Sequence, residues 1–283
     1  MKILITGING QVGHALMRKL IDHDLVGLTR KDCDLTDTEQ IKHVIDLHQP
    51  DMIINPAAYT NVDQAEDESE LAFRINRDAP KVMAEKAREN NVPFIHFSTD
   101  YIFDGQKVTA YEEDEIAYPL GVYGQSKLAG DKEIQGVGGK YYIFRTSWVY
   151  SNIGQNFYLK IKKLSLEEKE LKVVSDQLGV PTSNYFIAEQ IKQIITLLDD
   201  NNSGVYNLVP NGSCSWYDFA RLIIKKSNPD FNLENIYPIY SHELQSKTER
   251  PKNSILNNDK IKKTFDLTIN DWRKELEKII NEA

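Results

Sequence analysis

The chain begins with a short apolar run, Lys2–Thr6, that leads directly into three glycines spaced three residues apart, Gly7, Gly10 and Gly13. Glycines in this pattern allow a tight turn, a close approach of backbone to a ligand, and close packing of the following helix. We expect that helix over Gln11–His23, and its first amides and positive dipole end favour a pyrophosphate. The motif therefore predicts dinucleotide contacts at Gly7, Gly10, Gln11, Val12 and Gly13, although a plain strand-to-helix turn is the alternative.

Short apolar runs alternate with segments of helical period through the first half of the chain, which predicts an α/β fold with a doubly wound parallel sheet. The predicted strands are Lys2–Thr6, Leu25–Thr29, Asp51–Asn55, Pro93–Ser98 and Lys140–Arg145, and the predicted helices are Gln11–His23, Thr36–His48 (with Thr36 as N-cap) and Glu70–Asn91. The sequence thus indicates a Rossmann-type domain over residues 1–150.

The second half, residues 151–283, is richer in Asn, Gly, Ser and Pro, with shorter periodic stretches. We expect it both to complete the sheet and to form a smaller substrate lobe, so that the boundary is discontinuous. The predicted elements are strands at Leu171–Val174 and Val205–Leu208, and helices at Asn184–Leu198, Ser215–Lys226 (capped by Ser215) and Asn270–Ile280.

Charge and composition exclude several classes of partner. Thirty-four Lys and Arg against 42 Asp and Glu give a net charge of −8, which disfavours nucleic acid and anionic membrane surfaces. The two cysteines, Cys33 and Cys214, suit a reducing compartment as free thiols. Because no signal peptide or membrane span is legible, we expect a cytoplasmic protein with a small-molecule substrate.

The ends of the second and third strands should face the cofactor. The second ends near Arg30 and Lys31, two cations that suit a 2′-phosphate and so favour NADPH, with NADH as the alternative. Asp34 and Leu35 follow, and Asp34 is placed either to reach the adenine amino group or to cap the next helix. Small residues after the third strand, Ala57 and Ala58 followed by Tyr59, would let the cofactor lie against the backbone.

Tyr123 and Lys127 lie four residues apart and share one face if this segment is helical. A neighbouring ammonium would lower the Tyr123 pKa and make the phenol a better proton donor. Ser98 and Thr99 end the fourth strand at the same sheet edge, where a hydroxyl would hydrogen-bond a substrate carbonyl. Together with a dinucleotide site this set predicts hydride transfer to a ketone, while an exposed surface pair is the alternative for Tyr123 and Lys127 alone.

These motifs resemble the extended short-chain dehydrogenase/reductases and, within them, the dTDP-4-dehydrorhamnose reductase family. The resemblance rests on the glycine motif, on Tyr123-x-x-x-Lys127, and on longer strings at 55–66, 98–105, 123–132, 145–150, 176–182 and 250–254. It implies reduction of the 4-keto group of dTDP-4-dehydro-β-L-rhamnose, for cell-surface polysaccharide.

The resemblance also assigns roles. Tyr123 would protonate the 4-oxygen, Lys127 would hold the nicotinamide ribose, and Thr99 would bond the sugar oxygen. Asp100 would be a further substrate contact. Trp148 would be an apolar wall for the sugar, or else simply a core residue, and we favour Arg250 for the diphosphate.

One departure concerns metal. The family is associated with magnesium held by acidic side chains at a dimer interface, but this chain has His14 and Ala15 where one acid is expected. We therefore predict no metal site and leave a homodimer open. Two other functions also stay open, a non-catalytic regulatory subunit of the methionine adenosyltransferase type and a nucleotide-sugar epimerase or dehydratase.

Overall fold

One central sheet organises the protein, whose computed structural model describes residues 1–244 and 247–281. Its six strands are β1 (Lys2–Ile5), β2 (Asp24–Gly27), β3 (Met52–Asn55), β4 (Phe94–Thr99), β5 (Tyr141–Thr146) and β10 (Gly204–Asn207). They are all parallel, in the order β10-β5-β4-β3-β1-β2. The predicted doubly wound sheet is confirmed. Because the order reverses between β1 and β3, a crevice is expected at their carboxyl ends.

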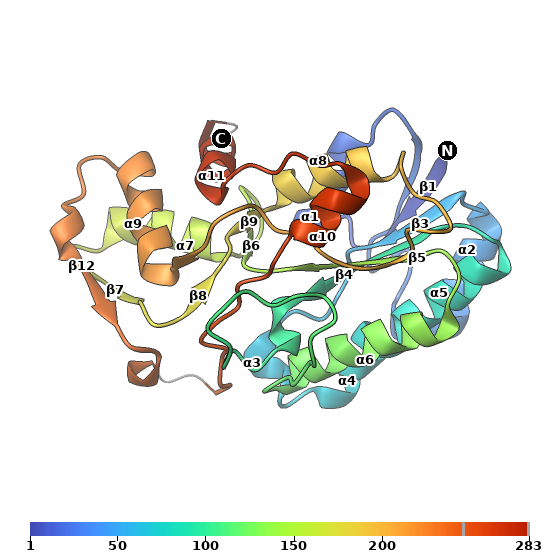
Figure 1. The fold of residues 1–283 in the computed structure, drawn as a ribbon, viewed down its shortest axis with the longest axis horizontal. Helices are drawn as coiled ribbons and strands as arrows, with labels where there is room; N and C mark the ends of the chain where they lie inside the picture. Colours follow the sequence, from blue (N-terminus) through green and yellow to red (C-terminus); the bar gives the residue numbers. More distant parts are fainter. Residues whose placement is uncertain (245–246, 282–283) are drawn as a thin grey trace.

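Helices cover both faces of the sheet (Figure 1). The helices on one face are α1 (Gln11–Lys19), α8 (Asn184–Ile194) and α10 (Asp259–Phe265), and those on the other are α2 (Thr38–His48), α5 (Ala79–Glu89) and α6 (Val122–Val137). Every residue of β3 and β4 is buried, as expected for central strands covered on both sides. The sheet thus has two hydrophobic cores, one under each helical layer.

Two helix starts test the predicted caps. The helix predicted to begin at Thr36 is capped by Asp37 instead, whose carboxylate accepts hydrogen bonds from the amides of Glu39 and Gln40 at 3.0 and 3.1 Å. The Thr36 prediction was wrong because its hydroxyl donates to Asp34. Ser215 does cap α9 (Trp216–Ser227), in a reciprocal pair with Asp218.

The helix predicted over residues 70–91 contains a π-helical turn. It consists of α4 (Ser69–Phe73), the π turn η1 (Arg74–Asp78) and α5. The π turn carries the buried Asn76, whose side chain bonds both backbone groups of Tyr59, at 2.8 and 3.0 Å, and the Ser126 hydroxyl at 3.0 Å. Such turns are frequent at functional sites. This one ties the segment after β3 to α6.

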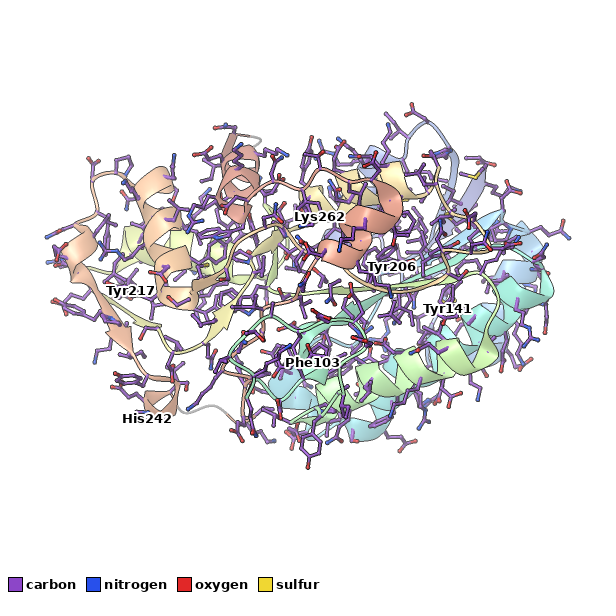
Figure 2. All side chains as sticks on the ribbon, in the orientation of Figure 1. Phe103, Tyr141, Tyr206, Tyr217, His242 and Lys262 are labelled. Atoms are coloured by element: carbon purple, nitrogen blue, oxygen red, sulfur yellow. The ribbon has the colours of Figure 1, made fainter. Side chains whose placement is uncertain are left out.

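The second half contributes to both parts of the molecule, as Figure 1 shows. Strand β10 and helices α8 and α10 join the sheet layers, and in Figure 2 Tyr206 lies beneath α10, where its ring packs 5.1 Å from Phe265. A separate core is shared by α7 (Phe157–Glu167), β7 (Leu171–Val174), α9, β12 (Ile236–Ile239) and α11 (Trp272–Asn281). Of these elements, α7 and β12 were not predicted, and neither was α10.

Short elements complete the chain. They are α3 (Val62–Ala65), η2 (Asp100–Ile102), β6 (Val149–Tyr150), β8 (Leu178–Gly179), β9 (Thr182–Ser183), β11 (Cys214–Ser215), η3 (Leu233–Asn235) and η4 (Ser241–Glu243). Cys33 and Cys214 are both free thiols, as predicted, and both are buried. None of the helices in the described part of the chain is long and apolar enough to span a bilayer.

The contact between α6 and the π turn makes a stability prediction. A Cβ at Gly130 would lie 2.0 Å from the backbone oxygen of Asn76, whereas Gly136 in the same helix has open space around it. Gly130→Ala should lower the free energy of unfolding by about 1–3 kcal/mol through overpacking. Gly136→Ala, the matched control, should raise it by up to about 1 kcal/mol. Urea denaturation measures both, and equal effects of the two substitutions would contradict the packing described.

Candidate active site

The glycine motif forms a tight turn at the switch point of the sheet. Gly7 has φ +59°, and a Cβ there would lie 2.8 Å from the Cβ of Ala57 after β3. A Cβ at Gly13 would come within 2.4 Å of the Gly7 carbonyl oxygen. Gly10 precedes α1 without a side-chain cap, and the first turn of α1 has no acidic residue. The helix start therefore fits the pyrophosphate of a dinucleotide.

Gln11 and Val12, predicted as cofactor contacts, lie in the first turn of α1. The Gln11 side chain is occupied by the protein itself, since its Oε1 accepts hydrogen bonds from Ser151 at 2.7 Å and Asn156 at 2.9 Å. Val12 packs against the sheet core. Both residues can therefore serve a ligand through their backbone, and Gln11 also joins the glycine turn to the second half of the chain.

A pocket of about 410 Å³ lies beside this turn. It is lined by seven of the predicted cofactor residues, Gly7, Arg30, Asp34, Leu35, Ala57, Ala58 and Tyr59. Lys31, in contrast, does not line it. Small and apolar walls with one guanidinium at the rim fit the adenosine half of a phosphorylated dinucleotide.

Two polar groups of this pocket are already bonded within the protein. The Asp34 carboxylate accepts from the Thr36 amide and hydroxyl, both at 2.9 Å, and these bonds lower the Asp34 pKa. The Tyr59 hydroxyl donates to Glu68 at 2.8 Å, and burial together with this carboxylate raises the Tyr59 pKa to about 12. Asp34 is thus an ionised acceptor in the pocket and does not cap α2.

Tyr123, in the first turn of α6, lies beside Thr99 at the end of β4. Burial raises the pKa of the Tyr123 phenol, and a side-chain hydrogen bond with Thr99 opposes that shift. The ring of Tyr101 packs edge-on at 5.5 Å. The structure therefore brings the predicted proton donor and the predicted hydroxyl together.

The Lys127 side chain is bonded to residues of β4. Its ammonium donates to the Phe97 carbonyl at 2.6 Å and lies 3.0 Å from His96 Nε2. Burial lowers the Lys127 pKa to about 8, while Asp131, one turn further along α6, raises it. The expected lowering of the Tyr123 pKa by this ammonium is corrected, because in the folded protein the Tyr123 pKa is raised and the opposing hydrogen bond comes from Thr99.

Asp100 is a buried carboxyl next to these groups. Burial raises its pKa to about 6, against hydrogen bonds with Ser254 and Thr99 that lower it. The Thr99 hydroxyl lies 3.1 Å from Asp100 Oδ1. Residues Thr99, Asp100 and Tyr123 thus form one cluster at the carboxyl end of β4.

Trp148 is half-buried and lies between the sheet and the second core. Its backbone has φ +47°, an uncommon value for a bulky residue, and its ring stacks on Trp216 with centroids 3.5 Å apart. A Cβ at Gly179 would meet this ring at 2.4 Å. The partial exposure favours the predicted role as a wall over that of a plain core residue.

Arg250 lies near the cluster from the opposite side. It forms an ion pair with Asp63 at 3.3 Å. Burial raises the pKa of Tyr101, the ring beside Tyr123, to about 12, and the Arg250 charge partly opposes that shift. It does not line the pocket beside the glycine turn. Its place is therefore consistent with a contact to substrate and not to cofactor.

Comparison with known proteins decides the family. The model described as "RmlD substrate binding domain" matches residues 1–283. A dTDP-4-dehydrorhamnose reductase of Burkholderia thailandensis is 36% identical, over 96% of each chain, and that of Escherichia coli K12 is 36% identical over 100% of this chain and 98% of the relative. The chain belongs to this reductase family. A solved structure of a Bacillus anthracis dTDP-4-dehydrorhamnose reductase in complex with NADP is 33% identical and superposes with a TM-score of 0.94. The match covers 100% of this chain and 99% of the Bacillus anthracis chain.

Four polar residues of this reductase site were missed in the sequence, Asn55, Asn76, His96 and Asp131. Each is buried and bonded to another residue of the site. Asn55 and His96 interrupt strands that are otherwise strongly apolar, and a polar residue there needs a partner. That interruption was the available signal, whereas Asn76 and Asp131 lie in helices where polar residues are ordinary.

From the raised Asp100 pKa we predict how the stability of the protein depends on pH. In the folded protein the Asp100 pKa is raised from 3.8 to about 6. The stabilising contribution of the protonated carboxyl is therefore fully present below pH 3.8, the pKa in the unfolded chain, and is lost as the pH rises through 6. Asp100→Asn removes that loss, so at pH 8 the variant should be more stable than wild type by about 2–3 kcal/mol. At pH 3.5 the two should be equal. Denaturant unfolding at both pH values measures this, and a difference independent of pH would contradict it.

Proposed function

We propose that this protein reduces the 4-keto group of dTDP-4-dehydro-β-L-rhamnose to give dTDP-L-rhamnose. The observation that carries the proposal is the placement of the Tyr123 phenol beside the Thr99 hydroxyl, at the carboxyl edge of the sheet that also carries the glycine turn. A phenol there is placed to give its proton to an oxygen that Thr99 also bonds. The names of the relatives and the family model support the same reaction.

Each site residue has a task in this reaction. A bound nicotinamide would supply the hydride that C4 of the sugar takes up. Tyr123 donates the proton to the 4-oxygen, Thr99 holds that oxygen, and Lys127 holds the nicotinamide ribose. Asp100 and Arg250 contact the substrate, and the Trp148 ring covers one face of the sugar.

The cofactor we assign is NADPH, with NADH as a weaker donor. Arg30 lines the pocket, and its guanidinium suits a 2′-phosphate. The Bacillus anthracis relative was solved in complex with NADP, which supports the assignment. The adenosine half would lie among Leu35, Ala57 and Ala58, with the pyrophosphate at the start of α1.

The two halves of the chain have different proposed roles. Residues 1–150 would bind the cofactor and carry the proton donor, while 151–283 would complete the sheet and close the site over a nucleotide sugar. A homodimer and a cytoplasmic location remain predictions.

Replacement of the proton donor tests the proposed reaction. Tyr123→Phe should lower the rate of NADPH oxidation with dTDP-4-dehydro-L-rhamnose by about 10²–10⁴-fold, because the general acid is lost. NADPH binding, measured by fluorescence titration, should persist. Tyr118→Phe, at an exposed tyrosine, is the control and should keep full activity. A folded wild-type protein that binds NADPH but oxidises none would instead favour the regulatory subunit, and one purified with tightly bound NAD would favour the epimerase or dehydratase.

The cofactor assignment is tested at Arg30. Arg30→Ala should lower the preference for NADPH over NADH by about 10-fold or more, since a charged hydrogen bond to the 2′-phosphate is lost. Lys31→Ala, which removes a neighbouring cation outside the pocket, should change the ratio much less. The ratio of kcat/KM for the two cofactors is the measurement, and an unchanged ratio in Arg30→Ala would refute the role of Arg30.

A further inference from the structure

A row of buried polar side chains crosses three neighbouring strands and ends at Lys127. The Thr6 hydroxyl, just after β1, donates to Asn55 Oδ1 of β3 at 2.6 Å, and Asn55 Nδ2 lies 3.1 Å from His96 Nδ1 of β4. The other ring nitrogen of His96 lies 3.0 Å from Lys127 Nζ. All four residues are at most 2% exposed. The row therefore connects the glycine turn to the lysine away from bulk water.

One polarity of this row has every hydrogen-bond donor pointing toward Lys127. If the Asn55 amide N–H donates to His96 Nδ1, the neutral ring carries its hydrogen on Nε2. That hydrogen needs an acceptor, which an ammonium lacks and a neutral amine provides. The amine still donates to the Phe97 carbonyl at 2.6 Å. This polarity of the hydrogen bonds therefore fits Lys127 as a neutral amine.

The opposite polarity fits the ammonium. If the Asn55 amide turns by half a rotation, its oxygen and nitrogen exchange places at almost no steric cost. His96 Nδ1–H then donates to Asn55 Oδ1, and His96 Nε2 accepts from the ammonium. Thr6 then accepts from Asn55 Nδ2. The ammonium state holds one proton more than the amine state, and that proton is exchanged with solvent.

We propose that Thr6, Asn55 and His96 form a reversible hydrogen-bond chain that lets Lys127 gain and lose a proton in place, with the tautomer of His96 following the charge of the lysine. His96 and Asn55 act through Lys127 and are positioning residues. Burial, and then the neighbouring Lys127, lower the His96 pKa, so the ring stays neutral in both states.

The groups around the hydrogen-bond chain act on the lysine in opposite directions. Asp131 of α6 favours the ammonium, and it is itself paired with Arg145 of β5, whose Nε lies 3.6 Å from Asp131 Oδ2. Asp100 of η2, the short helix packed against α6, acts on Tyr123. Desolvation opposes the ammonium. A lysine balanced in this way can change charge when Tyr123 gives up its proton. This consequence rests on the proposed function, whereas the hydrogen-bond chain does not depend on it.

Nitrogen-15 NMR of the full chain with labelled histidine tests the proposal directly. The His96 signals, identified by their loss in His96→Gln, should show a neutral ring from pH 6 to 10. The hydrogen should lie on Nδ1 at low pH and on Nε2 at high pH, with a midpoint near the Lys127 pKa of about 8. In Lys127→Met the tautomer should not change with pH. Each of three results would overturn the proposed hydrogen-bond chain. They are a single His96 tautomer at all pH values in the wild type, the same change of tautomer in Lys127→Met, and a His96 imidazolium at pH 6–7.

Kinetics give a second readout. His96→Phe removes the acceptor for the ammonium, so the alkaline limb of the kcat/KM profile should move to lower pH by about one unit. His96→Gln, which keeps an acceptor oxygen, should restore part of that shift. Phe94→Leu is the matched control, because Phe94 is equally buried and its ring lies 6.1 Å from that of His96, and it should leave the limb in place. An unmoved limb in an active His96→Phe would contradict the chain. A wild type without reductase activity would refute the proposed function and leave the NMR result to decide the chain.

Discussion

A lysine amine buried at the carboxyl end of β4 is the constraint around which the site is arranged. Moving a charged amine out of water is costly unless it is bonded, and here the Phe97 carbonyl and His96 supply the partners. Small residues let α6 approach closely enough, since Gly130 touches the π turn and a Cβ at Gly124 would lie 2.2 Å from the Tyr101 carbonyl oxygen. The same close packing places Tyr123 beside Thr99. The position of one helix thus brings the proposed proton donor and the buried amine to the same edge of the sheet.

The reversal of strand order supplies the other half of the site. Gly7 and Ala57 meet just beyond the carboxyl ends of β1 and β3, and both line the pocket at this point. The second half of the chain is tied to this point through Gln11, whose side chain accepts from Ser151 and Asn156. Trp148, stacked on Trp216, stands where the two parts join. A ligand extending from the glycine turn past Tyr123 would therefore contact both parts, as a reductase of nucleotide sugars requires.

Much of this could be predicted from the sequence, because the sheet depends on local patterns. Apolar strands, the glycine motif and the Tyr123–Lys127 spacing are all local signals. The partners of Lys127 are not local, since His96 and Asn55 come from other strands and only the sheet order brings them together. The Tyr123 pKa is raised and not lowered as predicted, because spacing on a helix does not show how deeply the phenol is buried. Thr36 failed as a cap because its hydroxyl donates to Asp34, and the helix begins one residue later with Asp37 as its cap.

The proposed reaction transfers hydride from NADPH to C4 of a keto-sugar nucleotide while Tyr123 supplies the proton. The most direct measurement is the mass spectrum and NMR of the product formed from dTDP-4-dehydro-L-rhamnose and NADPH deuterated at both C4 positions. The account predicts a dTDP-rhamnose one mass unit heavier than the unlabelled product, with deuterium only at C4 of the sugar. Deuterium at another carbon, or product formed without deuterium, would contradict it.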